Sequence, residues 1–382
     1  MSEDSWFFHN PVPVTFSPGA ISDLSAHLHC RRAVLVTTRG FKVRGLVDQI
    51  QSLMGERLVG VLDDVKPNPD LPDLDEQGHR LRTHEPDMLI ALGGGSSMDT
   101  AKGLARLVVQ PEGRTLAGHF RDGEPFEHRP ALPWAAIPTT SGTGSEVTPF
   151  GTVWDFEKDK KYSVTGTDLY AAYAVLDPEL TVTQPLEITI YSGLDAVSHA
   201  LESTWNKNAS PVTLGFCVKS LQLALESLPT LKANPKSLEA RGRMMQASLL
   251  AGLAISQTRT ALAHSISYPL TTAFDLPHGF ACSFTLPALM RFNAGADDGR
   301  LKHLARCLGY DHAEGLADAL EALFETLMVP NYLSGYLPEQ DSIMALANQM
   351  LTPGRADNNL RAAGRSDVEA ILKESLDSLG FR

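Results

Sequence analysis

The sequence has few cysteines, a deficit of positive charge and no long apolar run. Its four cysteines lie far apart, in no spacing typical of a metal site, and predict reduced core thiols. The formal net charge of -12 argues against broad affinity for nucleic acid or for anionic membranes. No apolar run is long enough to cross a bilayer, and the start MSEDSWFFHNPVPV lacks the pattern of a signal peptide. We therefore expect a cytoplasmic protein whose partners include neither nucleic acid nor membrane.

The pattern of apolar residues divides the chain into two predicted domains. With 382 residues, 43% of them hydrophobic, two domains with large cores are expected. Before residue 185, short apolar runs such as AVLV, LVGVL, MLIAL and WAAI alternate with helical patterns. This alternation predicts a parallel sheet covered on both faces. We expect an α/β dinucleotide-binding domain over residues 1–185 and an all-α domain over residues 186–382, where long amphipathic segments replace the strands.

A run of three glycines, Gly93 to Gly95, follows the predicted strand MLIAL and precedes a predicted helix. Glycines allow the backbone to approach a phosphate closely, and a helix N-terminus offers N–H groups and the positive end of its dipole. The run does not match the G-x-G-x-x-G fingerprint, so it predicts either a phosphate-binding loop of another kind or a plain turn.

A second polar loop, PTTSGTGSEVT, follows the strand WAAI. Loops at the ends of neighbouring parallel strands favour a ligand crevice, although a solvent-exposed connection would have a similar composition. The hydroxyl groups that this loop offers belong to Thr139, Thr140, Ser141, Thr143 and Ser145.

Four residues of the helical half form a candidate metal site. Asp195 and His199 are four apart on a predicted helix, so their side chains share one face. His264 lies in a largely apolar helix, and His278 lies between a proline and a glycine. Taken singly, these are typical of a capping contact, a core histidine and a loop residue. Together they suit a divalent transition ion, Fe(II) or Zn(II), which can polarise a carbonyl oxygen.

Across nearly its whole length the chain resembles the iron-containing (group III) metal-dependent alcohol dehydrogenases. The resemblance rests on FFHNPVPVTFSPGAISDL, VKPNPD, GGGSSMDTAK, PTTSGTGSEVT, LDPELT, GLDAVSHALE, LPHG and TPGRADNNLR, in this order. It implies the fold shared with dehydroquinate synthase and metal ligands at Asp195, His199, His264 and His278. The cofactor residues that it implies are Gly94, Gly95, Ser96, Asp99, Thr139, Thr140 and Ser145, with Lys161 of KDKKYSV and Asn68 of VKPNPD.

The reaction that the resemblance implies is hydride transfer between a nicotinamide cofactor and a small aldehyde or alcohol bound to the metal. The α/β domain would hold NADH or NADPH, and the helical domain the ion. Relatives that prefer NAD often carry an Asp after the strand AVLV, whereas Thr37, Thr38 and Arg39 stand here. An arginine in place of the carboxylate would tolerate a 2′-phosphate, so we expect NADPH, or use of both cofactors. The resemblance also implies a homodimer or a larger homo-oligomer.

Two positions depart from the pattern of this family. Tyr268 stands where many members have a histidine four residues after the third ligand, and a phenol can donate or relay a proton. The alternative is that Tyr268 only fills volume. Arg259, with Thr258 and Thr260 beside it, replaces the usual small residues. A buried guanidinium needs an anion, which would be a protein carboxylate or an anionic substrate.

The stretch HSISYPLTTAFDLPHGFACSFTLP is similar to the phosphonoacetaldehyde reductase branch of the family. We therefore expect reduction of phosphonoacetaldehyde to 2-hydroxyethylphosphonate, with Arg259, Thr258 and Thr260 binding the phosphonate. Three alternatives stay open: a dehydrogenase of neutral primary alcohols, a lyase similar to dehydroquinate synthase, and a non-catalytic binding protein on the same fold.

Overall fold

The computed structural model describes residues 5–158 and 160–381, which divide into two compact units. One unit comprises Asn10–Thr140 and Ser145–Thr181, and the other comprises residues 5–9, Ser141–Gly144 and residues 182–381. The division at residues 181 and 182 lies near the predicted boundary at residue 185. The grouping of the loop Ser141–Gly144 with the second unit is not evident from the sequence.

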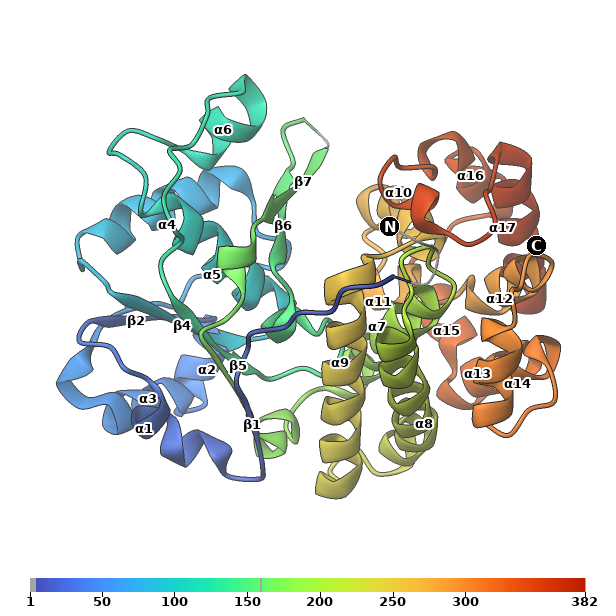
Figure 1. Cartoon of the computed structure of the whole chain (residues 1–382), viewed down its shortest axis with the longest axis horizontal. Coiled ribbons are helices and arrows are strands. Elements are labelled where there is room, and N and C mark those ends of the chain that lie inside the picture. Colours follow the sequence, from blue (N-terminus) through green and yellow to red (C-terminus); the bar gives the residue numbers. More distant parts are fainter. Residues whose placement is uncertain (1–4, 159, 382) are drawn as a thin grey trace. The chain divides into compact units, whose positions relative to one another are not determined.

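The first unit is built on a six-stranded parallel sheet in the order β1-β8-β5-β4-β2-β3. Every residue of β4 is buried, as expected for a parallel strand with helices on both faces. Figure 1 shows α1 and α3 on one face of this sheet and α4 and α5 on the other. The predicted parallel α/β architecture is confirmed. The strands are β1 (Val14–Phe16), β2 (Ala33–Val36), β3 (Leu58–Leu62), β4 (Met88–Gly93), β5 (Trp134–Pro138) and β8 (Tyr173–Leu176).

The helices of this unit follow the strands with one break that the periodicity does not reveal. The segment 41–55 has continuous helical periodicity, but Gly45 adopts φ 80° and divides it into two short helices. A left-handed residue cannot continue a right-handed helix. The helices are α1 (Leu24–His27), α2 (Arg39–Val43), α3 (Leu46–Met54), α4 (Leu71–Arg82), α5 (Gly95–Leu107) and α6 (Leu116–Asp122).

An antiparallel hairpin, β6 (Phe150–Asp155) with β7 (Lys160–Thr165), lies outside the main sheet. The sequence analysis does not predict it, because its apolar residues are too few to give a clear strand pattern. Val153 and Val164 are buried, whereas the other residues of β7 are partly buried or exposed to solvent.

The order in which the chain adds strands to the sheet reverses at β2. From β2 the chain runs outward to β3 and then returns to β4 on the other side of β2. In open α/β sheets, ligands bind beyond the carboxyl ends of the strands at such a point. Thr37 follows β2 there, and Gly93 ends β4.

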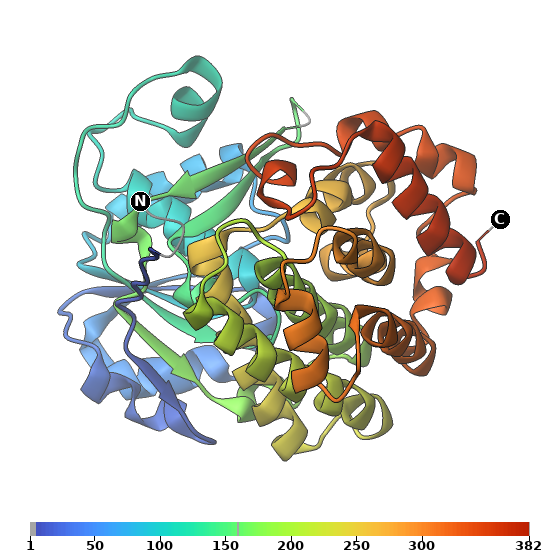
Figure 2. The same ribbon diagram turned by 45° about the vertical axis from the view of Figure 1, so that its right-hand side comes forward.

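The second unit is helical, and every named element in residues 182–381 is a helix. Its longest helices, α7, α8 and α9, lie side by side in both Figure 1 and Figure 2. A capping box of Ser210 and Thr213 starts α8, with Pro211 in its first turn. The helices are α7 (Leu186–Thr204), α8 (Pro211–Ala233), α9 (Leu238–Thr258), α10 (Leu262–Phe274), α11 (His278–Ala281), α12 (Leu286–Ala294), α13 (Arg300–Cys307), α14 (Ala313–Leu327), α15 (Val329–Leu333), α16 (Gln340–Met344) and α17 (Arg365–Ser378).

One continuous apolar core holds these helices together, with Trp205, Phe280 and Phe324 almost completely buried in it. Among the helices of residues 5–158 and 160–381, none combines the length and the apolar character that a membrane span requires.

Candidate metal centre and cofactor loops

One face of α7 carries three buried polar side chains: Asp195, His199 and Glu202. Their spacing of four and then three residues places them one above another on the helix. Glu202 is wholly buried and accepts hydrogen bonds from His264, at 2.5 Å from Nδ1 and at 3.1 Å from the backbone N–H. The sequence analysis missed Glu202, although its position seven residues after Asp195 on an apolar helix was a usable signal.

The three predicted histidine ligands surround a single carboxylate oxygen. Nε2 of His199 and Nε2 of His264 each lie 3.5 Å from Oδ1 of Asp195, and Nε2 of His278 lies 3.9 Å from it. The imidazole rings of His199 and His264 stack, with their centres 4.7 Å apart. The structure thus brings together all four residues that the sequence predicts to bind a metal, from α7, α10 and α11.

Close backbone packing positions α11 against α7. A methyl group at Gly279 would overlap the carbonyl oxygen of Tyr191, so only glycine allows this approach. The hydroxyl of Ser198 also donates to the carbonyl of Cys282 at 2.8 Å. These contacts fix the first residue of α11, His278, beside Asp195.

The loop Ser141–Gly144 supports the same cluster. Gly142 packs so tightly on α7 that a side chain there would overlap the carbonyl of Ser192. The carbonyl oxygen of Gly142 lies 3.3 Å from Nδ1 of His199. A backbone carbonyl at this nitrogen favours the tautomer that carries its proton on Nδ1 and leaves Nε2 as the electron-pair donor.

The electrostatics of the cluster favour ionised carboxylates. Burial opposes the charge on Asp195, but the neighbouring histidines, His199 first, hold its pKa far below the usual range. Burial also disfavours a charged His264, yet Glu202 and Asp195 outweigh it and raise the pKa of His264 to about 9. Burial lowers the pKa of His199, which keeps this imidazole neutral at pH 7.

The residues present fit a bound divalent ion. Within the described residues, Nε2 of His264 is buried and makes no hydrogen bond, whereas buried polar atoms nearly always have a partner. Donor atoms of Asp195, His264, His278 and Cys282 all lie within 4.8 Å of one another. Cys282 was not predicted at this site, and its thiol donates to Oδ1 of Asp195 at 3.3 Å. Burial raises the pKa of Cys282 well above its ordinary value, so this thiol is protonated and orients Asp195.

Tyr268 lies one helical turn after His264 on α10 and next to His278. The rings of Tyr268 and His278 are nearly parallel, with their centres 6.5 Å apart. Burial raises the pKa of Tyr268 to about 12, although Arg355 and Thr260 favour the phenolate. The phenol is therefore a proton donor at neutral pH rather than a base.

The predicted substrate residues lie at the junction of α9 and α10. Thr258 is wholly buried, and its hydroxyl lies 2.9 Å from that of Ser203 and 3.0 Å from the carbonyl of Arg259. Arg259 ends α9 with φ 66° and ψ 177°, and its side chain is exposed. The carbonyl of Thr260 accepts from Asn358 at 2.9 Å. The hydroxyl of Thr258 is thus used within the fold.

The two predicted cofactor loops lie side by side in the α/β unit. The backbone N–H of Thr139 donates to the carbonyl of Gly93 at 2.9 Å. A side chain at Gly94 would meet the hydroxyl of Thr140 at 3.0 Å, so the absence of a side chain at Gly94 lets Thr140 pack against the glycine run. Gly95 then begins α5, whose N-terminus offers backbone N–H groups to an anion. Thr143, by contrast, belongs to the segment grouped with the helical unit.

Asn68, Ser96, Asp99 and Ser145, four further predicted cofactor residues, make hydrogen bonds in the first turns of α5. Asn68, in a left-handed conformation with φ 53°, donates its N–H to Oγ of Ser96 at 3.3 Å. Asp99 accepts from the hydroxyl of Ser145 and from the N–H of Thr152, both at 3.0 Å. Lys161 lies on β7 with its ammonium 4.9 Å from the ring centre of Trp154.

Lys102, three residues after Asp99 on α5, is a buried lysine. It is wholly buried, and its ammonium donates to the carbonyls of Ser145 and Phe150 and to the hydroxyls of Ser145 and Thr148. These bonds tie the second loop to α5. The loop itself thus covers α5 on this side.

The residues after β2 have different surroundings. Thr37 is buried and its hydroxyl donates to the carbonyl of Leu92 at 2.9 Å, which joins β2 to β4. Thr38 pairs with Asp64 beyond the end of β3, and Arg39 is the first residue of α2. Thr38 and Arg39 are thus the residues of this turn placed at the carboxyl edge of the sheet.

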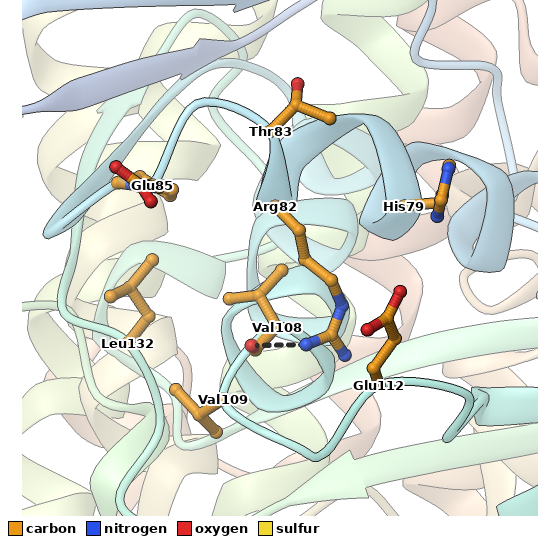
Figure 3. A pocket seen from close by; sticks show the side chains of 9 residues that line it. His79, Arg82, Thr83, Glu85, Val108, Val109, Glu112 and Leu132 are labelled. Carbon is orange, nitrogen blue, oxygen red and sulfur yellow. Dashed lines mark hydrogen bonds between the residues drawn. The ribbon is translucent and has the colours of Figure 1, made fainter.

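A hollow of about 520 Å³ lies at the opposite edge of this sheet (Figure 3). Its walls come from the C-terminal ends of α4 and α5 and from the segments that precede β4 and β5. Arg82 reaches across it and donates to the carbonyls of Leu107, Val108 and Gln110, which caps α5. The hollow is therefore remote from the predicted cofactor loops. It is lined by His79, Arg82, Thr83, Glu85, Pro86, Val108, Val109, Glu112 and Leu132.

Comparisons with known proteins agree with this arrangement. Residues 11–178 match the model of iron-containing alcohol dehydrogenases, and residues 189–376 match the C-terminal model of the Fe-containing alcohol dehydrogenase family. The NAD-dependent methanol dehydrogenase of Bacillus methanolicus is 32% identical over 97% of this chain and 99% of its own. The sulfoacetaldehyde reductase of Bilophila wadsworthia is 33% identical over 76% of this chain and 77% of its own.

Among solved structures, the sulfoacetaldehyde reductase of Bifidobacterium kashiwanohense in complex with NAD+ superposes with a TM-score of 0.88 at 29% identity. The superposition covers 97% of this chain and 98% of the other. The chain therefore belongs to the iron-containing alcohol dehydrogenase family and is an NAD(P)-linked alcohol oxidoreductase.

Proposed function

We propose that this protein reduces a small anionic aldehyde with NADPH or NADH, and that its substrate is phosphonoacetaldehyde, which yields 2-hydroxyethylphosphonate. The observation that carries the reductase assignment is the convergence of three imidazoles on Oδ1 of Asp195. The anionic substrate is supported by two relatives that are sulfoacetaldehyde reductases, since sulfoacetaldehyde also joins an aldehyde to an anion.

The proposed metal is Fe(II), with Zn(II) as a substitute that the same donors accept. Asp195, His199, His264 and His278 would hold it. When bound, such an ion acts as a Lewis acid towards the substrate oxygen. Glu202 and the carbonyl of Gly142 hold the Nδ1 sides of His264 and His199, so that the Nε2 atoms are presented towards Asp195.

When bound, the reduced nicotinamide cofactor would supply a hydride to the carbonyl carbon of the aldehyde, and the protein would supply a proton to the carbonyl oxygen. The products are the alcohol and the oxidised cofactor. Tyr268 is the proposed source of that proton, because its phenol stays protonated at neutral pH and lies beside His278.

The cofactor is proposed to lie along the carboxyl edge of the sheet. Gly94, Gly95, Ser96 and Thr140 would hold its phosphates, and Thr38 with Arg39 its adenosine ribose. Arg39 at the start of α2 is compatible with a 2′-phosphate, so we propose that NADPH is accepted as well as NADH. Asp99, Ser145, Thr139, Asn68, Thr143, Thr37 and Lys161 complete the proposed cofactor residues.

We also propose that the enzyme is cytoplasmic and at least dimeric. Its four cysteines, all free thiols, are compatible with a reducing compartment. Val14 and Phe16 on the edge strand β1 are each 36% exposed, which suits a surface that a second copy would cover.

A substrate panel tests this function. The protein is loaded with Fe(II) anaerobically and given NADPH or NADH with phosphonoacetaldehyde, sulfoacetaldehyde or propanal, while absorbance of the reduced cofactor is followed. We expect kcat/KM to be highest for an anionic aldehyde. A clear preference for propanal would favour a dehydrogenase of neutral alcohols, and conversion without net cofactor oxidation would favour a lyase. Absence of metal binding and of turnover would overturn the enzymatic proposal.

A further inference from the structure

Arg355 lies on the loop before α17, where it precedes the short helical turn η7 (Ala356–Asn358). Its guanidinium carbon lies 4.5 Å from the ring centre of Tyr268, which is the geometry of a cation–π contact. The side chain is only partly buried. This arginine is 77 positions after His278 in the sequence, and only the fold brings it to the aromatic ring next to the candidate metal centre.

Hydrogen bonds on both sides of Arg355 tie the loop to α10 and to the residues just before it. Before it, the backbone N–H of Thr352 donates to the hydroxyl of Ser265 at 2.8 Å, and this hydroxyl donates to the carbonyl of Met350 at 2.6 Å. After it, the side-chain amide of Asn358 donates to the carbonyl of Thr260 at 2.9 Å. Because Ser265 directly follows His264, these bonds hold Arg355 in a fixed place relative to a proposed metal ligand.

The guanidinium of an arginine is planar, and its five N–H groups lie in that plane. A planar fork of this kind matches two oxygens of a phosphonate, sulfonate or carboxylate group. Tyr268 serves as the platform, and its own ring lies parallel to that of His278.

The distances suit a short substrate. The two ring distances place the guanidinium carbon within about 11 Å of the ring centre of His278. A carbonyl oxygen and an anionic group joined through two carbon atoms lie on the order of 4 Å apart. A charge-assisted hydrogen bond adds roughly 2.8 Å at the anionic end. We infer that Arg355 binds the anionic group of the aldehyde and thereby selects an anionic over a neutral substrate.

This inference deepens the proposed function and rests on it. It assigns to Arg355 the task that the sequence analysis gave to Arg259. Arg259 is exposed at the end of α9, and its neighbour Thr258 directs its hydroxyl to Ser203 and to a carbonyl. Arg355, in contrast, is stacked on Tyr268, the residue that lies between it and His278 in the described contacts.

The test replaces Arg355 by Gln and by Lys in the metal-loaded, full-length enzyme. For Arg355→Gln we expect KM for phosphonoacetaldehyde to rise roughly 10- to 100-fold, the loss of one charge-assisted contact, while KM for propanal rises much less. Arg355→Lys keeps the charge without the fork, so its KM should fall between those of the wild type and Arg355→Gln. Arg361→Gln is the matched control, because Arg361 also stacks on an aromatic ring, 4.1 Å from the centre of Phe292.

Binding of ethylphosphonate, which cannot be reduced, gives a second measurement by calorimetry. We expect the wild type and Arg361→Gln to bind it equally and Arg355→Gln to bind it at least 10-fold more weakly. If Arg259→Gln no longer binds ethylphosphonate and Arg355→Gln still binds it, the role of Arg355 is overturned, while the proposal of an anionic substrate is retained. If the wild type binds ethylphosphonate through Arg355 but reduces no anionic aldehyde, the proposed function fails and the anion site stands. If the wild type neither binds ethylphosphonate nor reduces an anionic aldehyde, both are overturned.

Discussion

Replacing Glu202 by Gln tests the role of the buried carboxylate behind His264. Each oxygen of Glu202 accepts one N–H of His264, from Nδ1 and from the backbone. Glutamine keeps one acceptor and places an amide donor at the other position. If the amide faces Nδ1, the imidazole must carry its proton on Nε2, the atom that faces Asp195. That tautomer cannot donate an electron pair to a metal.

The expected magnitude follows from these contacts. Loss of a carboxylate behind a ligating histidine lowers metal affinity by ~10- to 100-fold, which is about 1.4–2.7 kcal/mol. The apoprotein should also be less stable by about 2–5 kcal/mol, because a buried hydrogen-bonded charge has lost its partner. Glu202→Gln keeps the size of the side chain, so no cavity contributes to either number.

The assay is competition for Zn(II) or Co(II) against a chromophoric chelator, with urea unfolding of the apoprotein measured in parallel. Glu187→Gln is the matched control, since Glu187 lies at the start of the same helix and accepts from the hydroxyl of Tyr336 at 3.1 Å. Its metal affinity should stay within about twofold of the wild type. A folded Glu202→Gln variant with unchanged metal affinity would refute the reasoning, and a change in stability alone would assign Glu202 a purely structural role.

Three further predictions concern the backbone and one buried charge. Arg259 has a backbone conformation that is accessible almost only to glycine. Arg259→Gly should therefore unfold at a higher urea concentration than Arg259→Ala, although alanine usually stabilises a protein relative to glycine. Equal urea midpoints for the two variants would refute backbone strain at this residue. Gly142→Ala should cost about 1–3 kcal/mol and weaken metal binding, because its methyl overlaps Ser192, whereas Gly215→Ala, in open space on α8, should be neutral or stabilising. Burial lowers the pKa of Lys102 to about 8 in the folded protein, against roughly 10.4 in the unfolded chain. Between these two pH values the ammonium is therefore deprotonated in the folded state and still protonated in the unfolded state. The stability of the wild type relative to Lys102→Met should therefore rise by about 2.5 kcal/mol from pH 8 to 10.4, and a flat difference would contradict the burial of a charged lysine.

The sequence predicts well what local pattern determines. The run MLIALG is apolar throughout and becomes a strand buried on both faces, and the glycines after it open α5 as expected. Two of the four predicted ligands, Asp195 and His199, share one face of a helix. The other two are recognisable from their neighbours, because His264 lies in a largely apolar helix and His278 lies between a proline and a glycine. Gly45 shows the limit of this approach, since periodicity continues across it while its left-handed conformation ends a helix.

What the sequence does not predict depends on contacts between distant segments. Cys282 looks like one of four scattered thiols until α11 packs on α7 and brings its sulfur to Asp195. Lys102 looks like a solvent-exposed partner of Asp99 until the second loop covers it with four acceptors. Thr258 has the hydroxyl expected of a substrate residue, yet Ser203 and a neighbouring carbonyl engage it. In each case the residue type was evident and its partner was not.

The balance of charge explains why a residue outside the predicted ligand set should govern metal affinity. Asp195 and Glu202 place two buried carboxylates on one face of α7, and three neutral imidazoles would leave both charges uncompensated. A proton on His264 neutralises only one of them, in keeping with the raised pKa of that residue. A divalent ion neutralises both and leaves every imidazole neutral, as ligation requires. Removing the charge of Glu202 therefore leaves the ion and its one remaining carboxylate with a net positive charge in a buried site.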